Sequence, residues 1–404
     1  MPTASGIAKS VVYKKETVFG TPPTATGAQV VRRVSTDFNL SKESYQSDEI
    51  RTDYQVADMR HGVRSVEGTI SGELSSGTYD DFIASALAKP FAGITPTALG
   101  SVTIAAGSGQ TLGMYTVTRT TGSYLTDGLR VGQVIRLTGF NANNNAKNLL
   151  VVVLTTTVAT VVVLNGTTLT PETVASAGTY ALAGKSTFAP STGHTDDSYT
   201  IEQFFSDIGQ SEIYTGNKVN TASFALPATG LVTTDFGFVG QDLKQTGTAA
   251  YFTNPTAQTL TGIFAAVNGA LVVNGKVVGL VTGLNININR NITSEAVVGS
   301  NIKPELYEGR ITVDGDFSTL FQDRTFSDYF NAETEIGLIC AVTESNLPAA
   351  NFMTFTLPRI KLSTDTKDDG EKGIVAQNSF TALKGTGANG FEATTIQIQD
   401  SAAV

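Results

Sequence analysis

Carboxylates that share one face of a predicted strand are the feature of this sequence with the clearest chemical meaning. In residues 65–74 and 311–318, polar residues that include carboxylates alternate with small or apolar residues. Successive side chains of a strand point to opposite faces, so each segment should turn its carboxylates to one side. Such a face would repel anions such as phosphates, and the alternative is an ordinary solvated face. The candidates are Glu67, Glu73, Asp314 and Asp316, with Glu202 as a further one.

Residues that could perform catalysis are few. His61 and His194 lie far apart and lack the HExxH spacing of a zinc site, and a single cysteine, Cys340, excludes an internal disulfide. The glycine-rich residues 105–113 lack the lysine of a phosphate-binding loop and are predicted to form an ordinary loop. The acidic residues 365–373 do not follow the spacing of a calcium loop and are predicted to form a solvated hairpin tip. We therefore expect no enzyme, no metal and no cofactor, and we expect Cys340 in the core.

Length and composition limit the class of protein further. The chain has 404 residues, which suggests two or three domains. It has no apolar run of 18 residues, so we expect no membrane span, and its first residues lack a signal-peptide pattern. The formal net charge of −9 argues against a surface that grips nucleic-acid phosphates.

The elements that position these residues are predicted to be mainly strands. Runs of β-branched and aromatic residues alternate with turn residues along most of the chain. Two helices are predicted, at residues 78–88 and 325–332, and the first is expected to begin at a Thr78 N-cap.

A repeat relates the two predicted helices and the strands before them. Residues 62–83 match residues 309–330 at a constant offset of 247 with six identities, which include Gly68 with Gly315. A second match pairs FALP at 224–227 with FTLP at 355–358. The strand–helix–strand order in both halves favours a duplication over chance similarity.

Two further features interrupt the repeat. Residues 95–195 are rich in Thr, Val and Gly and are predicted to form an inserted small β barrel or sandwich. Long polar stretches, 41–61 and 291–308, precede the acidic strands and are expected to be either flexible loops or contact segments. Alternation places Arg64 on the core side of its strand, so a bulge or strand start is expected there.

Three segments resemble the tail tube proteins of long-tailed, siphovirus-type bacteriophages. These are RTDYQVADMRHGVRSVEGTISGELSSGTYDDFIASAL at 51–87, the stretch at 198–243, and TFTLPRIKLSTDTKDDGEKGIVAQNSFTAL at 354–383. The resemblance implies a mainly β fold with two tandem tail-tube β-sandwich modules, each with one flanking helix, plus the inserted β domain. The expected modules are 1–94 with 196–262, and 263–404, with the insertion at 95–195.

The resemblance also implies a function. Copies would form rings, here of three chains with six similar positions, that stack into a non-contractile tube for DNA. The acidic residues would face the lumen, and the insertion would lie outside. Implied partners are other copies, tail terminator and tail tip proteins, a tape measure protein in the lumen, and double-stranded DNA in transit. The protein would be assembled in the host cytoplasm and reside in the virion tail. Candidates for contacts between rings are Glu43, Tyr45, Asp48, Arg51, Tyr54, Asn301, Lys303 and Glu305.

Three other functions fit parts of the sequence. The inserted domain could bind host glycan, which would make the chain a tail-tip or surface-adhesion protein. Exposed aromatic residues on that domain would favour adhesion, and the segment offers Tyr115, Tyr124, Phe140, Tyr180 and Phe188. The related ring protein of contractile secretion systems and a tail-associated hydrolase are the remaining alternatives.

Overall fold

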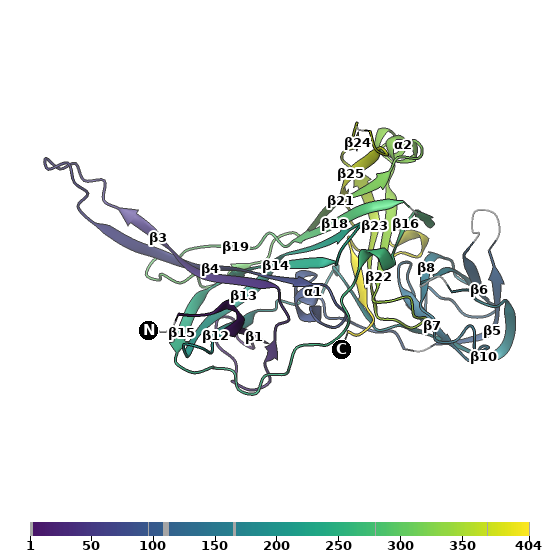
Figure 1. Ribbon diagram of the computed structural model, residues 1–404, viewed down its shortest axis with the longest axis horizontal. Coiled ribbons are helices and arrows are strands. Elements are labelled where there is room, and N and C mark those ends of the chain that lie inside the picture. The colour runs from purple at the N-terminus through teal and green to yellow at the C-terminus, as the bar shows by residue number, and fades with distance from the viewer. Residues whose placement is uncertain are drawn as a thin grey trace.

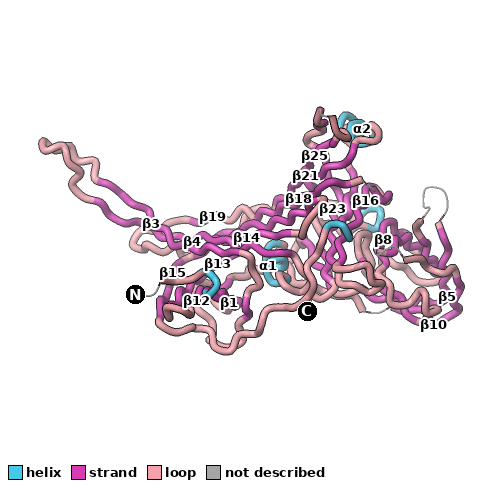
Figure 2. Tube along the Cα trace, viewed as in Figure 1, coloured by secondary structure: helices cyan, strands magenta, loops and turns pink. Residues whose placement is uncertain are grey.

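The computed structural model describes residues 3–95, 97–107, 113–164, 167–278, 280–369 and 371–403. Strands dominate these residues, and both predicted α-helices are present, so the mainly β class is confirmed. Figure 1 shows a long hairpin at one end of the molecule, a barrel at the other end, and a sheet that connects them. Figure 2 shows how little helix the described chain contains. The loop predicted at 105–113 lies mostly outside the described residues.

A central sheet of eight antiparallel strands runs through both halves of the chain. Its order is β3–β4–β14–β13–β18–β21–β25–β23. The two halves meet where β13 pairs with β18 along Thr221–Pro227 and Gly283–Asn289. The bounds are β3 Ser35–Gln46, β4 Met59–Glu73, β14 Thr233–Gly240, β13 Gln210–Pro227, β18 Val281–Asn289, β21 Thr312–Leu320, β25 Val375–Ala382 and β23 Phe352–Leu362, with the short β24 (Thr366–Lys367) also on β25.

Each half adds a smaller layer of strands over the apolar face of the central sheet. In the first half the layer contains β1 (Lys9–Lys15), β2 (Gln29–Val30), β12 (Tyr199–Phe205) and β15 (Asp242–Gly247). In the second half it contains β16 (Gly269–Val273), β17 (Lys276–Val278), β22 (Ile336–Thr343) and β26 (Gln397–Asp400). One hydrophobic core spans both halves, with members such as Phe236, Phe317 and Phe355.

The strand registers of the two halves coincide step by step. Tyr199 pairs with Asn217 before a bulge, and Ile336 pairs with Ile360 before a bulge at the same step. Paired residues of β4 correspond to those of β21 at a constant offset of 247. Their partners on β14 correspond to those on β25 at a constant offset of 142. The second tetrapeptide match is wrong, however, because Phe224 corresponds by register to Lys367. Instead, Phe224 and Phe355 touch each other across the core, with ring centroids 4.8 Å apart.

The two helices occupy corresponding places but differ in their surroundings. α1 (Asp80–Ala86) is buried beneath the first layer, whereas α2 (Thr325–Asn331) has no buried residue. The Thr78 cap is wrong, because Tyr79 takes the N-cap position and the Thr78 hydroxyl meets those of Ser75 and Thr259. Packing of the Tyr79 ring in the core sets where this helix begins.

The inserted segment forms a closed six-stranded barrel, in the order β10–β5–β6–β9–β8–β7. Its strands are β5 Thr97–Ala106, β6 Tyr115–Arg119, β7 Val134–Thr138, β8 Leu149–Leu154, β9 Val158–Val163 and β10 Glu172–Leu182. Beyond it, β11 (Lys185–Phe188) pairs with β26 and returns the chain to the second-half layer.

The barrel packs on the half of the chain into which it is not inserted. Its core includes Val272 and Ile339 of the second-half layer and Phe352 at the start of β23. The side-chain amide of Gln399 also donates to the Val134 carbonyl at 2.9 Å and accepts from the Val134 amide at 2.7 Å. Because Leu338 and Cys340 of the same layer face the main core, this layer lies between the barrel and the central sheet.

A buried pair of carboxyl groups joins the last strand to α1. Asp400 accepts hydrogen bonds from the Ser76 hydroxyl and from the Gly77 amide, the latter at 2.8 Å. Asp80 lies beside it, and among the described residues neither of its carboxylate oxygens has a donor. Burial, and then the Asp400 charge, raise the pKa of Asp80 well above its usual value, although Lys185 opposes the shift. Two buried carboxyl groups side by side disfavour the ionisation of both, which is why the pKa of Asp80 is raised.

This pair makes a prediction about pH. Since the native pKa of Asp80 lies above the unfolded value, its stabilisation is complete at low pH and is lost as pH rises through the native pKa. Each pH unit in that range should remove up to about 1.4 kcal/mol. Asp80→Asn keeps a donor to Asp400 without a titration, so we expect urea unfolding at pH 5, 7 and 9 to show a flatter profile. Asp328→Asn on exposed α2 is the control, and equal slopes for wild type and Asp80→Asn would contradict a raised pKa of Asp80.

Candidate functional site: an acidic sheet face

The outward face of the central sheet carries the predicted carboxylates. On β4, Val66 and Ile70 are buried in the core, while Glu67 is exposed and Glu73 half-buried on the opposite side. On β21, Val313 and Phe317 are buried, while Asp314 is exposed and Asp316 half-buried. The alternation predicted from the sequence therefore holds in both strands.

Strand pairing brings these carboxylates onto one continuous face. Asp235 pairs with Ser71 on one side and Ser223 on the other, and Ser223 leads through Asn287 to Asp314. Asp235 and Asp314 are thus three strands apart in one row, or about 14 Å at the usual strand spacing. This face, called the acidic face below, contains six carboxylates: Asp37, Glu67, Glu73, Asp235, Asp314 and Asp316.

By register, Lys218 of β13 falls in the row of Glu67 and Lys361 of β23 in the row of Asp314. The outward residues of the paired stretches of β3, β4, β14, β18, β21 and β25, all of which the structure describes, include no lysine or arginine. Polar neighbours fill the face instead. The side-chain amides of Asn285 and Asn287 donate to Asp316 and Asp314 at 3.2 and 3.1 Å. These bonds hold the carboxylates in place without neutralising them, so the face keeps its negative potential.

The cations nearest to the acidic face are paired elsewhere. Arg64 lies on the core side, as alternation predicts, and its guanidinium contacts Asp242 at 3.2 Å. The strand pairs regularly there, Arg64 with Lys42, so the expected bulge is instead one step further along. Lys218 and Lys361 each contact a carboxylate at 2.5 Å, Asp196 and Glu333 respectively.

Sequence reasoning missed two members of the acidic face and misplaced one. Asp37 and Asp235 each precede a core phenylalanine in a TDF triplet, an alternation that could have identified them. Glu202 is wrong as a candidate, because only 1% of it is exposed. Its carboxylate accepts from the Ser211 hydroxyl and the Tyr251 and Phe252 amides, so it fixes a turn inside the first half.

The polar stretches 41–61 and 291–308 are hairpin extensions from the central sheet. Residues 41–61 continue β3 and β4 into the long hairpin of Figure 1, where Asp48, Arg51 and Tyr54 are exposed. Residues 291–308 fold back beside β4 through β19 (Thr293–Ser294) and β20 (Leu306–Tyr307). Below they are called the arm and the second extension.

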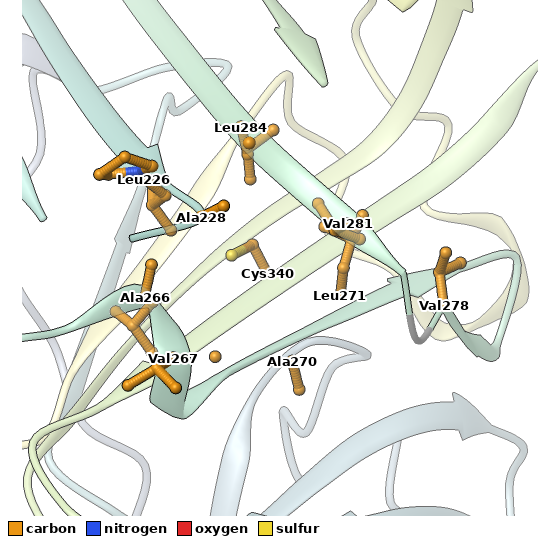
Figure 3. A pocket seen from close by; sticks show the side chains of 14 residues that line it. Leu226, Ala228, Ala266, Val267, Ala270, Leu271, Val278, Val281, Leu284 and Cys340 are labelled. Carbon is orange, nitrogen blue, oxygen red and sulfur yellow. The ribbon is translucent and has the colours of Figure 1, made fainter. Parts of the chain in front are cut away.

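A pocket between the halves is lined by apolar side chains. It has a volume of about 230 Å³, is partly open to solvent, and is lined by aliphatic residues such as Leu226, Leu271 and Leu284 and by Cys340 (Figure 3). Burial raises the pKa of the Cys340 thiol to about 12, so it stays protonated and acts as the core residue that the sequence predicts. Among the described residues no cluster of three His, Cys, Asp or Glu side chains could hold a metal ion.

The remaining features fit a structural role. In the predicted acidic hairpin tip at 365–373, residues 366–369 and 371–373 are exposed, whereas the Asp365 side chain is largely buried beside Lys367. On the barrel, Tyr124, Phe140 and Tyr180 are buried, so the aromatic residues considered for glycan binding do not form an exposed group. No helix in the described ranges is long and apolar enough to cross a membrane.

A strand-rich chain with an extended acidic sheet face and open sheet edges has the architecture of a structural, self-assembling protein. A family model described as "Phage tail tube protein" matches residues 6–382. The chain belongs to this family of phage tail tube proteins. It is therefore a component of the virion tail that assembles with itself and with other tail proteins. No curated protein matches the chain.

Proposed function

We propose that this chain forms rings of three copies whose acidic faces line the channel of the tail tube. The channel conducts the genome from capsid to host without binding it, and the chain has no enzymatic role. The observation that carries the proposal is a face with six carboxylates, on which the lysines that share its rows, Lys218 and Lys361, are each paired with another carboxylate. A duct must repel phosphates, because each cationic contact adds attraction and slows transit.

We infer that the chain contains two copies of one module, 1–94 with 196–262 and 263–404. The inference is supported by the coinciding registers and by the shared bulge between Tyr199/Ile201 and Ile336/Leu338. The seam of β13 with β18 then represents the contact between neighbouring modules. Three chains with two modules each supply six similar positions, and closed rotational symmetry satisfies every seam.

The placement of the barrel supports the same orientation. The barrel contacts the second-half layer on the side away from the main core, and the acidic face lies on the far side of that core. The barrel therefore decorates the outside of the tube. A tape measure protein would occupy the lumen before DNA, and terminator and tip proteins would meet the two ends.

Contacts between stacked rings are proposed for the exposed parts of the two extensions. The exposed candidates are Glu43, Tyr45, Asp48, Arg51 and Tyr54 on the arm and Asn301 and Glu305 on the second extension. Lys303 is half-buried, and its carbonyl accepts from the Gln241 side chain, so its ammonium alone is free to reach another ring.

Electron microscopy tests the proposal. We expect purified protein, or tails that contain it, to show stacked rings with three-fold symmetry, and an antibody against the barrel to decorate the whole tail. Label confined to the tail tip would favour the adhesion role instead. Rings that expose the acidic face outward would contradict the channel assignment.

A further inference from the structure

The two halves contain the same ion pair in two different surroundings. By register, Lys218 corresponds to Lys361, because they pair with Val239 and Thr381 at the same step. Their partners Asp196 and Glu333 precede β12 and β22 by the same distance, and both Lys–carboxylate contacts measure 2.5 Å. The Lys218 side chain is 2% exposed, whereas that of Lys361 is 39% exposed.

The second extension covers the first of these pairs. The Lys218 ammonium donates to the Leu306 carbonyl at 2.9 Å, and Leu306 is buried. Near the tip of the same extension, the Asn301 carbonyl accepts from the Arg64 amide at 2.8 Å, beside an isolated bridge of Arg64 with Ile302. The extension begins at the end of β18, which pairs with β13. From there it passes Lys218 of β13 and reaches β4 at Arg64.

The arm corresponds to the second extension but contacts nothing comparable in its own chain. Both leave the central sheet between equivalent strands, β3 and β4 or β18 and β21, and they have nearly the same length. At the offset of 247, Met59 takes the place of Leu306, and Tyr54 and Gln55 take the places of Asn301 and Ile302. Yet Met59 is 53% exposed and Tyr54 is 99% exposed, and Figure 1 shows the arm projecting from the molecule.

The second half contains the matching surface. Ile311 takes the place of Arg64 at the offset of 247, and a cavity of about 270 Å³ opens beside it. Lys384 and Arg310 line the same cavity. In the described sheet, β3 and β24 also leave one edge each without a strand partner, so a second copy could extend the sheet there.

We propose that the arm of one chain docks on the second half of the next chain, as the second extension docks on the first half within a chain. The Met59 carbonyl of the arm then accepts from Lys361, and residues 54–55 lie beside Ile311. This inference rests on the proposed ring, since it names the contact that closes the ring. It reassigns Tyr54 from ring stacking to this contact and leaves Glu43, Tyr45, Asp48 and Arg51 for contacts between stacked rings. The arm projects from the single chain because its docking surface belongs to another copy.

Cysteine pairs test the docking on the full-length chain. Gln55→Cys with Ile311→Cys should give a ladder of covalent oligomers up to the trimer after mild oxidation. Arg64→Cys with Ile302→Cys is the matched control within one chain and should give a monomer of altered mobility. Gln55→Cys with Ile374→Cys, an exposed residue away from the cavity, should give no ladder. Cys340 is buried and does not compete.

A second variant tests the proposed hydrogen bond from Lys361 to the docked arm. Lys361→Met should raise the protein concentration needed for ring formation about tenfold, because a charge-assisted hydrogen bond is lost at each seam. Lys372→Met, at an exposed tip, should leave that concentration unchanged.

The outcomes separate this inference from the proposed function. Rings without the Gln55–Ile311 ladder, or equal ladders from both test and mismatched pairs, would overturn the docking and leave the ring proposal standing. A chain that stays monomeric at every concentration and gives no ladder would overturn both.

Discussion

Reversing two carboxylates of the acidic face, Glu67→Lys with Asp314→Lys, is expected to leave tube assembly intact and to reduce infectivity at least tenfold. Both side chains are exposed and make no ion pair in the described structure, so folding should tolerate the change. Each chain gains four units of positive charge on the proposed lumen wall. Lysines there attract the phosphates of the passing duplex and release counterions, which turns a repelling wall into a binding one.

DNA binding by purified tubes measures this effect directly. Wild-type tubes should not bind duplex at physiological salt, whereas the variant should bind with an affinity that falls steeply as salt rises. Asp328→Lys with Glu371→Lys makes the same charge change at exposed positions off the acidic face. If this control impaired DNA release equally, or if the face variant remained fully infectious, the lumen assignment would be lost.

Phe82→Ala is expected to destabilise the chain by about 3–5 kcal/mol. The Phe82 ring is 1% exposed and lies against Tyr13, Tyr199 and Phe238, with centroids 4.7, 5.6 and 5.2 Å away. Truncation removes the apolar contacts of the helix and leaves a cavity between α1 and two layers of strands. Urea unfolding followed by circular dichroism would give the free energy of unfolding.

The corresponding change on the second helix provides the comparison. Tyr329 occupies the place of Phe82 at the offset of 247, but α2 is open to solvent and Tyr329 is only half-buried. Tyr329→Ala should therefore cost less than about 1.5 kcal/mol. Equal losses for both variants would show that the burial of α1 contributes nothing beyond that of α2.

Much of the fold follows from local patterns in the sequence. Period-two alternation around Glu67 and Asp314 predicts which side chains face outward, because one face of each strand must be buried. Apolar spacing and acidic first-turn residues predict both helices, and the composition of residues 95–195 predicts the barrel. The repeat at an offset of 247 predicts that β4 and β21 occupy equivalent places, which their registers now support.

Long-range pairing is what the sequence could not provide. That Asp235 and Asp314 share a row depends on β13 pairing with β18, residues more than fifty positions apart. Glu202 resembled an exposed strand carboxylate because no local pattern reveals the two backbone amides that bind it. The match of FALP with FTLP was misleading because both tetrapeptides fill one core.

The final strand affects the timing of folding during translation. β26 pairs with β11 and β23, supports the barrel through Gln399, and bonds the segment before α1 through Asp400. It is synthesised after every element that it joins. Until β26 has been made, a nascent chain therefore lacks the strand that links its two halves and its barrel. A chain that stops before β26 would lack these contacts, and we expect it to be less stable.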